Sequence, residues 1–174
     1  HDSLSHEPYY ALGRCIEARA RHFLAFALIQ KMLHGVWRLA SRPDVAVDVA
    51  SAGLACCSLE VEAAGQRGLL VASETVPQAA AVTVLVVAGT VTTAVEPALV
   101  RLFDEHAQHG PVIIVSFGAC ATSGGPYWDA PTVRPGIEAL FPGQEIASYV
   151  PGCPPRPEAL VVELERLVDS RIPA

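Results

Sequence analysis

Two apolar runs separated by a helical stretch constrain the fold of this chain most. The runs, VTVLVVAG at residues 82–89 and PVIIVSFG at 111–118, are nearly continuous, rich in β-branched residues and end in glycine. Such runs are typical of strands buried on both faces of a parallel sheet. Between them, residues 96–110 predict a helix, with Pro97 near its start and Gly110 just past its end. The three segments together predict a parallel βαβ unit.

Further segments of the same two kinds lie on either side of this unit. Strands are predicted at 45–53, 69–73 and 146–150, helices at 59–65 and 157–169, and a loop rich in glycine and proline at 121–142. Strands that alternate with helices predict an α/β fold with a mostly parallel sheet flanked by helices. We expect one such domain over residues 46–174.

The apolar stretch at residues 22–40 is predicted to be a helix within an N-terminal extension, residues 1–45. It is apolar on nearly every face, but it carries Lys31 and Arg38 within one membrane-helix length, about 20 residues. It is therefore a poor membrane span. We expect a core or subunit-interface helix, with contact to a membrane surface as the alternative.

Composition and charge narrow the class of function. Of the 174 residues, 51% are hydrophobic and 17% are charged, which is apolar for a small protein alone in water. We therefore expect a subunit whose surface is partly covered by partners. The net charge is −6 and Lys31 is the only lysine. Because phosphate binding needs a concentrated basic face, nucleic acid is not an expected partner.

Four of the five cysteines follow predicted strands. Cys56 and Cys57 follow the first of them, Cys120 follows the strand at 111–118, and Cys153 follows the last, with a glycine shortly before each. The carboxyl ends of parallel strands share one edge of a sheet, and ligands bind in the crevice there. We therefore expect these four thiols to meet.

Zinc and a [4Fe–4S] cluster both accept four cysteines. The adjacent pair favours the cluster, because neighbouring thiolates that leave the backbone in different directions can reach different irons. A disulfide between Cys56 and Cys57 would close a strained ring, and five cysteines fit no closed disulfide framework. A structural zinc site remains the more distant alternative. Cys15 lies outside the pattern and is expected to be structural.

Four stretches carry a resemblance to a known family: GLACCSLE, AGTVTTAVEPALVRLFDE, SFGACATSGGPYW and YVPGCPPRPEAL. From residue 47 to 168 the chain resembles the iron–sulfur B subunit of NADH–quinone oxidoreductase, respiratory complex I. The same family includes the small subunits of energy-converting NiFe hydrogenases. The tandem cysteines are similar to the quinone-reducing branch, whereas SFGACATSGG is closer to the hydrogenases.

The resemblance implies a flavodoxin-like domain with one [4Fe–4S] cluster at the carboxyl ends of the strands, and the cluster's ligands would be Cys56, Cys57, Cys120 and Cys153. It implies an electron-transfer subunit, inactive alone, of a membrane-associated complex that reduces quinone or, alternatively, acts as a hydrogenase. The implied partners are a large, hydrogenase-like subunit, another iron–sulfur subunit and membrane-arm subunits, with quinone at the shared interface. The implied location is peripheral, on the cytoplasmic side of a bacterial or archaeal membrane.

Some neighbouring residues are candidates for supporting roles. Glu60 matches the family's CCxxE glutamate and is a candidate for proton uptake beside a reduced cluster; the alternative is a helix-start carboxylate favoured by the dipole. Tyr127 and Trp128 are expected to pack against or shield the cluster. The family has an arginine-rich segment near quinone, but here the corresponding residues 61–87 contain Arg67 as their only basic residue.

Overall fold

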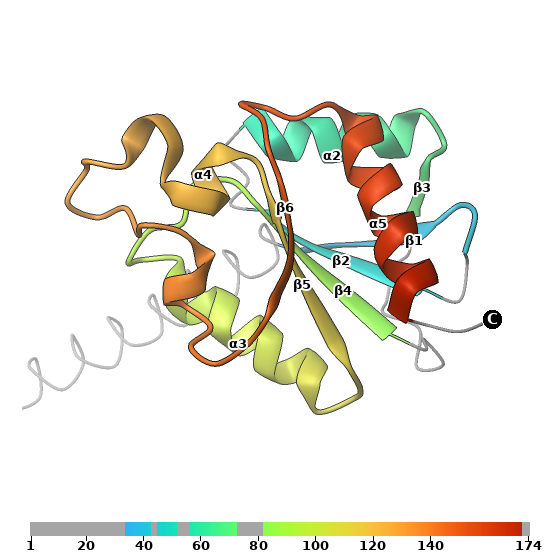
Figure 1. Ribbon diagram of the computed structural model, residues 1–174, viewed down its shortest axis with the longest axis horizontal. Helices are drawn as coiled ribbons and strands as arrows, with labels where there is room; N and C mark the ends of the chain where they lie inside the picture. Colours follow the sequence, from blue (N-terminus) through green and yellow to red (C-terminus); the bar gives the residue numbers. More distant parts are fainter. Residues whose placement is uncertain (1–33, 43–44, 52–55, 73–81, 172–174) are drawn as a thin grey trace, which may run out of the picture. The chain divides into compact units, whose positions relative to one another are not determined.

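The computed structural model describes residues 34–42, 45–51, 56–72 and 82–171. Within these residues the strands form one six-stranded sheet in the order β3-β1-β2-β4-β5-β6 (Figure 1). The strands are β1 (His34–Leu39), β2 (Val45–Ser51), β3 (Leu70–Ala72), β4 (Val82–Ala88), β5 (Val112–Phe117) and β6 (Ile146–Val150). The helices are α2 (Cys56–Gln66), α3 (Glu96–Ala107), α4 (Ala119–Ser123) and α5 (Pro157–Arg171), with 3-10 turns η1 (Gly125–Tyr127) and η2 (Ile137–Ala139).

The sheet is mostly parallel, as predicted. β2 pairs with β4, β4 with β5 and β5 with β6, each time in parallel. Every residue of β4 is buried, and so is every residue of β5 after Val112. The two apolar runs of the sequence therefore form the middle of the sheet, and the flavodoxin-like α/β fold is confirmed.

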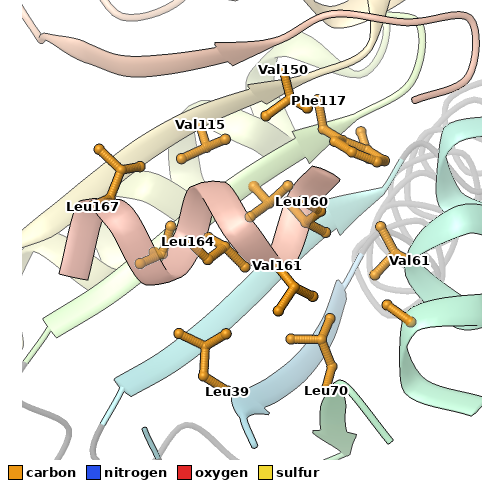
Figure 2. Packing of buried hydrophobic residues seen from close by; sticks show 14 of the residues in the cluster. Leu39, Val61, Leu70, Val115, Phe117, Val150, Leu160, Val161, Leu164 and Leu167 are labelled. Carbon is orange, nitrogen blue, oxygen red and sulfur yellow. The ribbon is translucent and has the colours of Figure 1, made fainter. Parts of the chain in front are cut away.

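Apolar side chains pack on both faces of the sheet. Along β4, Val84 and Val86 belong to one cluster of buried residues, and Leu85 and Val87 belong to the other. This alternation is the two-residue period of a strand. α2 and α5 cover the first face, where α5 turns its leucines toward the sheet (Figure 2). α3 and η2 contribute to the second cluster (Figure 1).

The helix predicted at residues 22–40 is wrong over its last part. His34–Leu39 form strand β1, which pairs antiparallel with both β2 and β3. The segment is apolar on nearly every face, a pattern that fits a strand inside a sheet as well as a buried helix. Residues 22–33 and Cys15 lie outside the described residues. Because β1 is part of the sheet, the sheet includes residues that precede the expected domain start at residue 46.

Helix α2 differs from its prediction at both ends. It begins at Cys56 rather than at residue 59, and it continues through Gly65 to Gln66. Gly65 does not end the helix. It lies inside α2, in close contact with Trp37. A Cβ atom on Gly65 would lie 2.4 Å from the Trp37 ring carbon Cζ3 of β1. The glycine therefore lets α2 pack against this indole.

Candidate metal centre

The predicted site residues lie where strands give way to helices at one end of the sheet. Cys56 and Cys57 open α2, which follows β2. Cys120 is the second residue of α4, which begins directly after the turn that ends β5. Cys153 lies in the connection between β6 and α5. Three different strand-to-helix connections thus supply the four thiols.

The connections that carry Cys120 and Cys153 are joined through their backbones. The Gly118 N–H donates to the carbonyl of Val150 at 2.9 Å, and the Ala119 N–H donates to the carbonyl of Gly152 at 2.8 Å. These bonds continue the pairing of β5 with β6 beyond the ends of both strands. They keep the two connections side by side at the point where the cysteines occur along the chain.

Gly118 is also the point where the α2 cysteines meet the β5 connection. Its φ of 90° lies in the left-handed region, which side chains disfavour. A Cβ atom here would lie 2.4 Å from Cys57 Sγ and 3.3 Å from Pro155 Cδ. A residue with any side chain would therefore separate the three connections. This glycine precedes Cys120 by two positions, as the sequence pattern of glycine before cysteine suggested.

The thiols differ in burial and influence one another. Cys57 and Cys120 are 1% and 3% exposed, whereas Cys56 and Cys153 are exposed. Burial raises the pKa of the Cys57 thiol to about 12, with further contributions from the charges of Cys56, Cys120 and Cys153 and a hydrogen bond with Cys56. A buried thiol of this kind becomes a ligand when a cationic centre displaces its proton.

Four cysteine thiols are the donor set that a [4Fe–4S] cluster takes. The four cysteines form no disulfide. Among the described residues, no group of three or more histidine, cysteine, aspartate or glutamate side chains is gathered tightly enough to hold one metal ion. A [4Fe–4S] cluster takes one thiolate at each of its irons, so its ligands need not converge on one point. The residues present therefore fit a four-iron cluster.

Glu60, Tyr127 and Trp128, the charged and aromatic residues that follow the cysteines closely in the sequence, differ in burial. Glu60 lies in the first turn of α2 and is partly buried. Tyr127 and Trp128 are 57% and 72% exposed in this chain, and their expected packing against the cluster stays a prediction.

Sequence reasoning missed the contacts that hold the Cys120 connection. Ser116 Oγ lies 2.9 Å from Thr122 Oγ1, and the Thr122 hydroxyl donates to the Gly118 carbonyl at 3.0 Å. The signal was a single serine inside the apolar run of β5. Farther along the loop, Arg134 Nε donates to Glu96 Oε2 at 2.6 Å. No local pattern connects those two residues, because they are far apart in the sequence.

Residues 55–167, more than half of the chain, match the protein family described as NADH ubiquinone oxidoreductase, 20 Kd subunit. The chain belongs to this family. The matched residues include all four cysteines of the candidate site. The resemblance that the sequence motifs indicated is thereby confirmed.

Several relatives from this family are similar in sequence. The B 1 subunit of NADH-quinone oxidoreductase from Salinispora tropica is 42% identical over 125 residues, which are 68% of this chain and 62% of that protein. The corresponding B 2 subunit from Streptomyces griseus is 40% identical over 122 residues, 68% of this chain and 50% of that protein. The chain thus spans between half and two thirds of the length of these two relatives.

One chain of a solved structure shares the fold of the present chain. It is the membrane-bound sulfane sulfur reductase, an archaeal respiratory membrane complex. The likeness covers 72% of this chain and 71% of the matched chain, with a TM-score of 0.51 and 20% sequence identity. At this level of identity the likeness supports the fold.

Proposed function

We propose that this chain is the electron-transfer subunit of a multi-subunit, membrane-associated oxidoreductase of the complex I type. In this proposal Cys56, Cys57, Cys120 and Cys153 hold one [4Fe–4S] cluster. When bound, such a cluster supplies one-electron transfer. The observation that carries the proposal is the close approach of the three cysteine-bearing connections at Gly118, where a Cβ atom would lie 2.4 Å from Cys57 Sγ and 3.3 Å from Pro155 Cδ. Membership of the family supports the same assignment.

The chain's own contribution is ligation and control of the surroundings. Cys57 and Cys120 anchor the centre in the interior, where few water molecules screen its charge. Cys56 and Cys153 are at the surface, where an electron donor or acceptor can approach. Burial and hydrogen bonding to sulfur are the means by which a protein sets a cluster's potential. The chain has no activity of its own in this account.

Two large apolar side chains that follow the cysteines in the sequence are exposed in this chain. Leu59 follows the cysteine pair on α2 and is 69% exposed, and Trp128 follows the Cys120 helix and is more exposed still. Exposed apolar residues mark interaction surfaces where they form a patch, and tryptophan is enriched among the residues that contribute most to binding. We propose that the large, hydrogenase-like subunit covers them. Another iron–sulfur subunit and membrane-arm subunits would complete the complex.

Quinone is the proposed electron acceptor, at the interface with the large subunit. The tandem cysteines support it, as do the relatives named as B subunits of NADH-quinone oxidoreductase. The motif SFGACATSGG supports the alternative, a hydrogenase-type acceptor, because it is closer to the hydrogenases. Arg67, the only basic residue in 61–87, forms an ion pair with Glu158. The usual arginine-rich approach to quinone is thus lacking in this segment.

We propose a peripheral location on the cytoplasmic side of a bacterial or archaeal membrane. None of the helices within the described residues is both long and apolar enough to cross a bilayer. Attachment to the membrane would come from partner subunits in this account.

The proposal is tested on the intact complex, purified anaerobically through this chain. Iron, acid-labile sulfide, nickel and zinc are measured per complex, together with the rate of quinone reduction. Iron and sulfide without nickel, with quinone reductase activity, support the proposal. Nickel in a stoichiometric amount supports the hydrogenase alternative. Zinc without iron or sulfide contradicts electron transfer by this chain.

A further inference from the structure

Two hydroxyl groups, of Ser116 and Thr122, form a chain of hydrogen bonds that leads to the Cys120 connection. Ser116, on β5, is fully buried at 0% exposure. Its Oγ lies 2.9 Å from Thr122 Oγ1, and the Thr122 hydroxyl donates to the Gly118 carbonyl at 3.0 Å. A threonine hydroxyl has one proton, which here goes to Gly118. Ser116 is therefore the donor to Thr122. The hydrogen-bond chain runs from β5, through α4, to the turn at Gly118.

The hydrogen-bond chain ends at Gly118, the residue that matters most for the geometry of the site. The Gly118 carbonyl accepts both the hydroxyl and, at 3.1 Å, the backbone N–H of Thr122. The same glycine lies directly against Cys57 Sγ. Cys120 sits between the two residues that these bonds join. Its backbone is consequently fixed from both sides.

Helix α4 needs such anchors because it is short. It has 5 residues, and isolated helices of this length are not stable in water. On its other side, a Cβ atom on Gly136 would lie 2.3 Å from the Thr122 carbonyl oxygen, so the returning loop presses on the same residue. Thr122 is thus held between β5 and this loop, and α4 is held with it.

We propose that Thr122 and Ser116 are positioning residues for Cys120. They hold α4 so that the Cys120 thiolate meets the cluster, and the inference rests on the proposed function, in which Cys120 is a ligand. Without the Thr122 hydroxyl, the buried Ser116 hydroxyl loses this acceptor, and an unsatisfied buried hydroxyl is unfavourable. The strand then no longer fixes the orientation of the short helix.

The test compares Thr122→Val with Ser123→Ala in the intact complex. Valine keeps the shape of threonine and removes the hydroxyl. Ser123 is a matched control, because its Oγ also donates four residues back, to the Ala119 carbonyl at 3.3 Å, but it is exposed and has no link to β5. We expect Thr122→Val to lose cluster iron to a chelator about 10- to 100-fold faster than the wild type, by analogy with the loss of metal affinity that follows removal of an outer-shell partner. Its reduced cluster should also have an altered EPR spectrum.

Ser123→Ala and Thr122→Ser, which restores the hydroxyl, should behave as the wild type in both measurements. Equal rates and equal spectra for Thr122→Val and Ser123→Ala would overturn the inference. If Thr122→Val fails to assemble, Ser116→Ala decides by the same comparison. It removes only the link to β5 and should accelerate iron loss in the same direction.

The two proposals can fail separately. If Cys120→Ser retains the whole cluster, the proposed ligand set is wrong and the positioning role falls with it. If Cys120→Ser loses the cluster but Thr122→Val matches Ser123→Ala, only the positioning role is wrong.

Discussion

Gly118 and Cys57 are in contact so close that no side chain fits between them. A Cβ atom on Gly118 would lie 2.4 Å from the Cys57 sulfur. Gly118 follows β5, whereas Cys57 belongs to the first turn of α2. The contact therefore joins two of the three connections that carry the cysteines, and the backbone of Gly118 joins the third through Val150.

Gly118→Ala should deplete the cluster. The methyl group must displace Cys57, and overpacking of this kind costs about 1–3 kcal/mol of the free energy of unfolding. Gly143→Ala is the matched control, because Gly143 also has a positive φ, 81°, but has nothing within 4 Å of its Cβ position. Iron and sulfide per complex are measured for both. Equal cluster content in the two variants would show that the contact is unimportant.

The stability of the cluster-free chain should fall at high pH. The pKa of Cys57 is raised in the folded chain from 9.0 to about 12. Below pH 9 the thiol is neutral in both states, so its stabilising contribution is complete. Above pH 9 the unfolded chain releases the proton first, and the free energy of unfolding falls by about 1.4 kcal/mol per pH unit until the folded thiol also ionises.

Urea denaturation of the cluster-free chain between pH 8 and pH 12 tests this dependence. The wild type is compared with Cys57→Ala, which removes the titrating group and keeps every other one. The wild-type curve should fall more steeply than that of the variant. Parallel curves would mean that folding does not shift the pKa of Cys57.

The ion pair of Arg134 and Glu96 should stabilise the loop after α4. Arg134 Nε donates to Glu96 Oε2 at 2.6 Å, and the Arg134 backbone N–H donates to the Val91 carbonyl at 2.9 Å. The pair is partly exposed, so its loss in Arg134→Gln should cost about 0.5–1 kcal/mol of the free energy of unfolding. The exposed pair of Arg166 and Glu163 on α5 is the control.

Denaturant titration of Arg134→Gln and Arg166→Gln measures the difference. The second substitution should change stability less than the first. The exchanged pair, Glu96→Arg with Arg134→Glu, should recover part of the loss. If Arg134→Gln and Arg166→Gln have the same free energy of unfolding, the ion pair of Arg134 and Glu96 does not have the assigned stabilising role.

Trp128→Ala should weaken assembly without affecting the fold. The indole is 72% exposed in this chain, so its removal opens no cavity. A tryptophan at the centre of an interface commonly contributes about 2 kcal/mol or more to binding. Val162→Ala, at an exposed position of α5, is the control. The fraction of chain recovered in the complex should fall for Trp128→Ala alone, and equal recovery of both variants would contradict docking at this residue.

The parts of the fold that depend on local pattern are predictable from the sequence. β4 and β5 follow from their apolar runs, and the cysteine positions follow from the strand ends. β1 is not predictable in this way, because its residues are apolar apart from His34 and Arg38 and fit a helix equally well. The close approach of Gly65 in α2 to Trp37 is likewise not predictable, because only the folded sheet brings the indole into place.

The supporting contacts of the candidate site are less predictable for the same reason. The Ser116 and Thr122 hydroxyls meet only because α4 folds back on β5. Arg134 reaches Glu96 only because the loop returns to the start of α3. Residue type and spacing indicate which side chains carry chemistry, whereas tertiary contacts decide what holds them.

The central claim is that these cysteines hold one [4Fe–4S] cluster. Its most direct test is the content of iron and acid-labile sulfide per complex in Cys120→Ser and Cys153→Ser, with Cys15→Ser as the control outside the predicted set. The account predicts that each of the first two lowers both quantities by the content of one cluster, whereas Cys15→Ser matches the wild type. Undiminished iron and sulfide in both Cys120→Ser and Cys153→Ser would contradict it.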